Sequence, residues 1–265
     1  AATCCNRFGI GDLYTLDNQM TEGNSMNKVL IMLSLALLIL GACSSNKTYL
    51  NTDQKLAKAD QLFARGKYSR AAELYSEVYF ERSSASSAHA LMRQGDSYFK
   101  INKFADARKA YEEFMDVFPN HVQVSDAHFQ YALCLYEDSL PAHYDQKETL
   151  HAIDSFKEFI SKYPGNPRVQ TALEYIRKAQ YKLIEKSFRN GYIYYKMKDY
   201  SSALMYFKEV TDLGNTDQLD RRSLYYTAKL LGKQGLSDQA REAFDSLQRK
   251  YPGSKETKKL AKKFK

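Results

Sequence analysis

Side chains that could act as nucleophiles or metal ligands are few and scattered in this sequence. It contains four cysteines and five histidines: Cys4, Cys5, Cys43, Cys134, His89, His121, His128, His143 and His151. They form no CxxC pair, no HExxH motif and no group with metal-ligand spacing. The sequence also has no phosphate-binding glycine loop and no GxSxG motif. It therefore predicts a protein that is not an enzyme and that needs no metal and no cofactor.

Cys43 is the cysteine for which the surrounding residues indicate a defined chemistry. Leu40, Gly41, Ala42 and Cys43 resemble a bacterial lipobox, which has an apolar residue, two small residues and a cysteine. In signals of that kind the thiol takes a diacylglycerol, the chain is cleaved between Ala42 and Cys43, and the new amine is acylated. Small residues are needed there because the peptidase approaches the backbone closely. The alternative is a buried cysteine that merely follows an apolar stretch.

The residues around Cys43 fit a lipoprotein signal peptide at 26–42. Residues 1–25 show no periodicity and are interpreted as an upstream segment outside the mature protein. Met26 and Lys28 then precede an apolar run, Val29 to Leu40, which is shorter than the roughly 20 residues of a membrane-spanning helix. Residues 43–51 are expected to be a lipidated linker, since several acyl chains together anchor a protein stably. Ser44 in place of an aspartate favours the outer membrane, with the protein facing the periplasm.

The rest of the chain predicts pairs of amphipathic helices, most clearly at residues 88–119. The apolar and small residues there recur with helical spacing: Leu91, Gly95, Tyr98, then Phe104, Ala107, Tyr111, Phe114 and Pro119. This spacing resembles a tetratricopeptide repeat. Further repeats are predicted at about 52–85, 125–166, 184–217 and 221–254. The expected fold is an all-α, right-handed α-solenoid of about five repeats.

Three irregularities divide this array. Repeat three carries an insertion between its helices, within Glu137 to Thr149, and one long helix is predicted from Arg168 to Lys196. The turn of repeat five is interpreted as displaced by one place. The predicted parts are therefore repeats one to three (52–166), the long helix with repeats four and five (167–254), and a basic tail (255–265) that frays.

Six apolar residues on the first helices of repeats one to three are candidates for a peptide-binding groove. They lie three before or four after the small residue of each repeat: Leu56, Phe63, Met92, Phe99, Phe129 and Tyr136. If exposed, they would suit an extended or helical peptide with aromatic side chains. The alternative is that they belong to the core between repeats. Cys134 is interpreted as a packed residue, because it lies within a helical apolar pattern.

The order of these features resembles the BamD family, lipoproteins of the outer-membrane β-barrel assembly machinery. The most telling stretch comprises Tyr163-Pro164, Ala172, Leu183, Glu185, Tyr194-Tyr195 and Ala203. The resemblance implies a scaffold that aids insertion of outer-membrane proteins. Its C-terminal repeats would bind the periplasmic domains of BamA, and its N-terminal repeats the C-terminal signal of unfolded barrel proteins. Other assembly-machinery lipoproteins are further expected partners.

Other periplasmic adaptors remain open as alternatives. One is a CpoB-like factor of the Tol-Pal system, although no heptad run precedes Ala59, as the coiled coil of such proteins would require. Another is an enzyme accessory or peptidoglycan-associated adaptor. The net charge of +8 could attract anionic lipid or acidic surfaces, or could belong to a solvated surface. Nucleic acid is not an expected partner of an exported lipoprotein.

Overall fold

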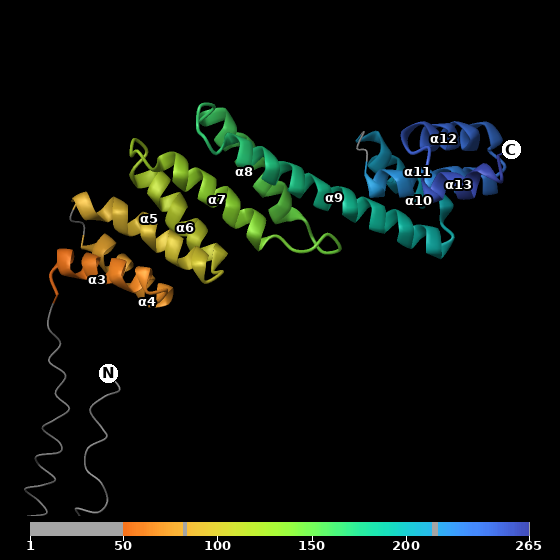
Figure 1. Cartoon of the computed structure of the whole chain (residues 1–265). Coiled ribbons are helices and arrows are strands. Elements are labelled where there is room, and N and C mark those ends of the chain that lie inside the picture. Colours follow the sequence, from red (N-terminus) through yellow and green to blue (C-terminus); the bar gives the residue numbers. More distant parts are fainter. Residues whose placement is uncertain (1–49, 82–83, 214–216, 265) are drawn as a thin grey trace, which may run out of the picture. The chain divides into compact units, whose positions relative to one another are not determined.

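The computed structural model describes residues 50–81, 84–213 and 217–264, which form helices and connecting turns without a strand. Figure 1 shows these helices, which are α3 (Thr52–Ala64), α4 (Tyr68–Phe80), α5 (Ser84–Lys100), α6 (Phe104–Val117), α7 (Val124–Asp138), α8 (Lys147–Lys162), α9 (Val169–Met197), α10 (Tyr200–Asp212), α11 (Gln218–Lys233), α12 (Ser237–Lys250) and α13 (Lys255–Ala261). The predicted signal peptide and Cys43 lie outside the described residues. No helix in the described ranges is both long and apolar enough to cross a membrane.

The helices pack in the five predicted pairs, α3 with α4 through α11 with α12, and each helix also contacts the next along the chain. The small residues that set the predicted repeat are buried, and Ala59, Ala107, Ala203 and Ala240 are fully so. The core is divided into clusters, each made by neighbouring helices. This confirms the predicted all-α solenoid, in which a repeat buries its apolar face against its neighbours.

The contact between Gly95 and Tyr111 shows why a small residue is required in the first helix of a repeat. The Tyr111 ring is fully buried and packs directly on the backbone of α5. A Cβ atom on Gly95 would lie 2.6 Å from Tyr111 Cε1. Gly191 has the same relation to Phe207 in repeat four, where a Cβ would lie 2.9 Å from the ring. The aromatic ring therefore occupies the space that a side chain would take.

Repeats one, two, four and five share one turn between their two helices. Each turn has a residue with positive φ: Gly66 (72°), Asn102 (59°), Lys198 (66°) and Gly235 (79°). The next residue donates its N–H to the carbonyl five residues earlier, as in a Schellman motif (Lys67 to Leu62, Lys103 to Tyr98, Asp199 to Tyr194, Leu236 to Leu231). Lys198 adopts a conformation that costs a non-glycine residue about 1 kcal/mol.

The predicted displacement of the turn in repeat five is wrong. Gly235 precedes Ala240 by the same five positions that separate Asn102 from Ala107, so the turn is in register. Repeat five differs in the residues that follow the turn, where Leu236 and Ser237 replace Lys103 and Phe104 of repeat two.

Repeat three replaces this turn with the predicted insertion, a loop between Asp138 and Lys147. Gln146 is buried and holds the loop together. Its amide donates to the carbonyls of Pro141 (2.8 Å) and Asp145 (3.0 Å), with longer contacts to two others. Its side-chain oxygen accepts from Thr149 at 2.8 Å. A single buried amide thus satisfies several loop carbonyls.

The long helix is confirmed as α9, whose 29 residues would extend about 40 Å. Its first half, with Ala172, Ile176 and Ala179, belongs to the core cluster of repeat three. Its second half, with Ile184 and Phe188, belongs to the cluster of repeat four. One helix therefore joins the cores of two repeats.

The prediction that the basic tail frays is wrong for its described residues. Residues 255–261 form α13, which contacts α11 and α12. Ser254 caps it by accepting the N–H of Thr257 at 3.1 Å, and Leu260 is almost completely buried. Phe264 stacks on Phe244, with ring centroids 5.0 Å apart. Leu260 and Phe264 therefore hold this lysine-rich segment against α11 and α12.

We expect Gly95→Ala to destabilise the protein. The added methyl overlaps the Tyr111 ring, and overpacking of this kind costs about 1–3 kcal/mol, more than the 0.5–1 kcal/mol by which alanine favours a helix. Urea unfolding measures the loss. Gly165→Ala is the matched control, because no atom lies within 4 Å of its Cβ position. A Gly95→Ala protein as stable as the wild type would contradict this packing.

Candidate functional site

The six residues of the predicted groove lie on α3, α5 and α7 and differ in burial. Met92 and Phe129 are 5% and 6% exposed and belong to core clusters. The other four are partly exposed: Phe99 and Tyr136 pack against those two clusters, and Leu56 and Phe63 pack against the core cluster of repeat one. The surface that this stripe offers therefore comes from these four side chains.

Phe63 lies beside a cation. The Arg93 guanidinium sits over its ring, 4.1 Å from the centroid, and also pairs with Asp96 at 3.3 Å. The edge of Tyr68 approaches the same ring, with centroids 5.1 Å apart. Phe63 thus combines a partly exposed aromatic surface with a neighbouring guanidinium, whose charge is shared with Asp96.

Tyr136 has a similar setting at the other end of the stripe. Its ring meets Tyr175 edge-on, with centroids 5.0 Å apart, and Lys182 Nζ lies 5.0 Å from its centroid. Lys182 also donates to Ser139 Oγ at 2.7 Å. Burial lowers the pKa of Lys182 and raises that of Tyr136. Both side chains line a cavity of about 610 Å³ between the repeat-three loop and α9.

Two tyrosine–aspartate bonds that the sequence patterns did not predict fix the faces of α3 and α5. Tyr75 donates to Asp60 at 2.6 Å, and Tyr111 donates to Asp96 at 2.9 Å. In both repeats the aspartate directly follows the small residue and the tyrosine comes fifteen positions later. That repeated spacing is the signal that could have revealed them. Each bond satisfies a tyrosine hydroxyl whose ring is packed in the core.

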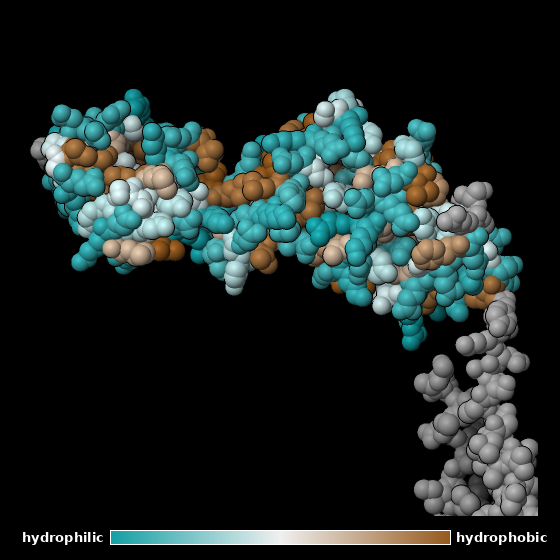
Figure 2. All heavy atoms as spheres, turned by 180° about the vertical axis from the view of Figure 1, so that it is seen from behind, coloured by the Kyte–Doolittle hydropathy of each residue, from teal (hydrophilic) through white to brown (hydrophobic). Residues whose placement is uncertain are grey.

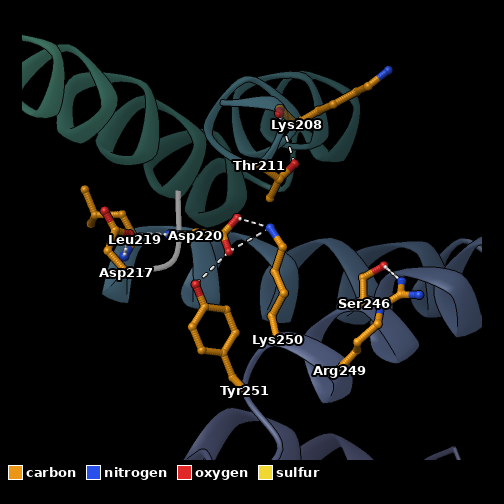
Figure 3. Close-up of polar contacts among 9 residues, drawn as sticks. All are labelled: Lys208, Thr211, Asp217, Leu219, Asp220, Ser246, Arg249, Lys250 and Tyr251. Atoms are coloured by element: carbon orange, nitrogen blue, oxygen red, sulfur yellow. Dashed lines mark hydrogen bonds and ion pairs between the residues drawn. The ribbon is translucent and has the colours of Figure 1, made fainter. Parts of the chain in front are cut away.

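Asp220 organises the C-terminal repeats (Figure 3). Its side chain is fully buried, and Lys250 and Tyr251 point toward it from the end of α12. Lys250 Nζ lies 3.2 Å from Oδ2, and the Tyr251 hydroxyl donates to the same oxygen at 2.7 Å. Burial and the bond to Asp220 raise the pKa of Tyr251. The Tyr251 carbonyl accepts from Thr257 at 2.7 Å, so this network also places α13.

The described residues hold no group of histidines, cysteines or acidic residues arranged to bind a metal ion. Cys134 is fully buried, as the sequence predicted for a packed residue, and burial raises the pKa of its thiol to about 12. A thiol in that state is a poor nucleophile. In Figure 2 the apolar surface forms small areas interspersed with hydrophilic ones.

The sequence model of one protein family matches this chain over residues 42–243; it is described as YfiO, outer membrane lipoprotein. The match includes most of the repeat array and begins beside Cys43. The chain therefore belongs to the YfiO family of outer membrane lipoproteins. Similar curated proteins carry the name outer membrane protein assembly factor BamD, which confirms the BamD-family resemblance.

Two of these relatives cover much of the chain. The protein from Rickettsia prowazekii is 26% identical over 87% of this chain and 94% of its own length. The protein from Caulobacter vibrioides is 23% identical over 74% of this chain and 65% of its own length. Among solved structures, the complex of the yeast Sti1 TPR2AB domain with pHSP90 has a TM-score of 0.43 at 12% identity, covering 78% of this chain and 80% of that one. So weak a likeness adds nothing to the assignment.

We expect Asp220→Ala to cost about 2 kcal/mol, because it leaves the Tyr251 hydroxyl without its acceptor and removes the ion pair with Lys250. Tyr251→Phe alone should cost about 1 kcal/mol. The two losses should not add in the double variant, since both remove the same bond. Urea unfolding of the four proteins measures this coupling.

Asp154→Ala is the control for Asp220→Ala. Asp154 pairs with Lys157 at 3.6 Å on the exposed surface, where such pairs contribute less than about 1 kcal/mol. Equal losses for Asp154→Ala and Asp220→Ala, or strict additivity in the cycle, would contradict the role of the buried network.

Proposed function

We propose that this protein is a scaffold lipoprotein that assists assembly of outer-membrane proteins. It is anchored to the outer membrane through acyl chains on Cys43 and faces the periplasm. It has no enzymatic activity and works by holding partners together. Family membership over residues 42–243 is the observation that carries this proposal, together with relatives named as assembly factors.

The two parts of the array have different partners in this proposal. The C-terminal repeats bind the periplasmic domains of a BamA-like barrel protein, alongside other lipoproteins of the machinery. The N-terminal repeats bind the C-terminal signal of unfolded barrel proteins, which ends in an aromatic residue and a carboxylate. Partly exposed rings beside cations, Phe63 with Arg93 and Tyr136 with Lys182, support this assignment because they offer both kinds of contact.

We expect Cys43→Ala to release the protein from the outer membrane, because the variant has no thiol to acylate. Membrane fractionation and the mass of the N-terminal peptide would detect the change. Affinity purification from detergent-solubilised outer membranes should recover a barrel protein with periplasmic domains together with the wild type, and much less of it with Cys43→Ala. Cys134→Ala is the control, since that thiol is buried and free.

Two results would contradict the proposal. An unmodified Cys43, or retention of residues 1–42, would remove the lipid anchor. Recovery of Tol-Pal components in place of the barrel protein would place the chain in another periplasmic system.

We also expect Phe63→Leu with Tyr136→Leu to weaken binding of a synthetic peptide that ends in phenylalanine with a free carboxylate. Leucine preserves apolar burial, while the lost ring contacts contribute about 0.5–1.5 kcal/mol, roughly a two- to twelvefold change in Kd. Fluorescence anisotropy measures the affinity. Phe80→Leu is the control, because Phe80 is 73% exposed on a second helix. An unchanged affinity would show that the peptide does not bind this stripe.

A further inference from the structure

A recessed surface between α9, α11 and α13 has a composition unlike that of the N-terminal stripe. It encloses about 330 Å³. The residues that line this tyrosine–lysine cleft are Tyr192, Tyr195, Lys196, Arg222, Tyr225, Tyr226, Lys229, Lys255, Glu256 and Lys259. Four are tyrosines, five carry a positive charge, and one is acidic. The cleft is a feature of the folded chain, since its residues come from three helices.

The spacing of these residues places them on one face of each helix. On α11 they lie at intervals of three and four, from Arg222 through Tyr225 and Tyr226 to Lys229. On α9 the same spacing separates Tyr192, Tyr195 and Lys196, and on α13 four positions separate Lys255 from Lys259. The three helices therefore contribute both rings and cations to the same cleft.

The positive charges of the cleft are not neutralised within the described part of the chain. None of the five cations forms an ion pair there, and the one lining carboxylate, Glu256, pairs with Arg221 outside the cleft at 3.0 Å. Helix-surface cations elsewhere do find carboxylates, as Arg189 does with Glu185 (2.7 Å) and Lys162 with Glu158 (2.8 Å). The cleft thus has a positive potential that a bound anion would neutralise.

Tyrosine rings lie beside three of these cations. Lys229 Nζ donates to the Tyr195 hydroxyl at 2.7 Å and lies 5.1 Å from the ring centroid, and this hydrogen bond lowers the pKa of Tyr195. Lys196 and Lys259 lie 5.7 and 5.9 Å from the centroids of Tyr192 and Tyr225. A lysine ammonium has three donors, so Lys229 keeps two for a ligand. Ring contacts reduce the entropy that the cations lose on binding.

We propose that the tyrosine–lysine cleft binds an acidic segment of a partner protein, with carboxylates on the lysines and an apolar side chain between the tyrosines. The five cations favour an anionic ligand, and the four tyrosine rings favour a ligand that also carries apolar side chains. A recessed site between helices admits a peptide, whereas a lipid surface would reach only its rim. The cleft lies in the C-terminal repeats, but the inference does not depend on the assembly role, because it concerns the charge and composition of one cleft whatever protein supplies the segment.

The test measures anisotropy of a short fluorescein-labelled peptide of glutamates and alanines with one central phenylalanine. The wild-type protein should bind it, should bind a glutamine-for-glutamate peptide far more weakly, and should lose affinity as salt rises. Lys196→Gln with Lys259→Gln should weaken binding about tenfold. Both lysines are exposed, so the fold should be retained, as circular dichroism and thermal unfolding would show.

Lys109→Gln with Lys208→Gln is the matched control. Both residues are exposed on second helices, away from the cleft lining, and the change in net charge is the same. Wild-type affinity in this control supports the cleft. Equal weakening in both double variants, or equal binding of the neutral peptide, would overturn the proposal. So would binding of phosphatidylglycerol vesicles that depends on Lys196 and Lys259 in the absence of peptide binding, which would assign these lysines to a lipid surface.

Discussion

Every repeat depends on a contact between a small residue in its first helix and the second helix that packs on it. At Gly95 and Gly191 the approach is so close that an aromatic ring occupies the place of a Cβ atom. The polar end of such a ring still needs a partner, and in repeats one and two the tyrosine hydroxyl reaches back to an aspartate on the first helix. The same side chain therefore packs the pair and fixes the outward face of the first helix.

This constraint explains why the fold could be predicted from the sequence. The small and aromatic positions are local, with fixed spacing inside each repeat, so helical periodicity reveals the pairs, the insertion and α9. The turns are also local: in four repeats a residue with positive φ stands at the equivalent position, which is Gly66, Asn102, Lys198 or Gly235. Lysine at such a position gives no sequence signal, and Ser237 in place of an aromatic hid the register of repeat five.

Features that depend on distant residues could not be predicted in the same way. The end of the chain reads as a solvated basic tail because lysine dominates it, yet Leu260 and Phe264 meet apolar surface contributed by α11 and α12. The groove prediction was limited for a similar reason. The spacing placed the six residues at equivalent positions of three helices, but spacing alone does not say which of them are buried. Packing against the neighbouring helices buries Met92 and Phe129 and leaves the other four partly exposed.

The N-terminal and C-terminal repeats differ in whether their surface cations are paired with carboxylates. The difference follows from where the structural carboxylates lie. In repeats one and two, carboxylates that bind tyrosines also lie near the cations, so Arg93 is paired with Asp96 while it covers Phe63. In the C-terminal repeats the structural carboxylate, Asp220, is fully buried and satisfied by Lys250 and Tyr251. It cannot neutralise the surface lysines of α9, α11 and α13, which leaves their charge available to a ligand.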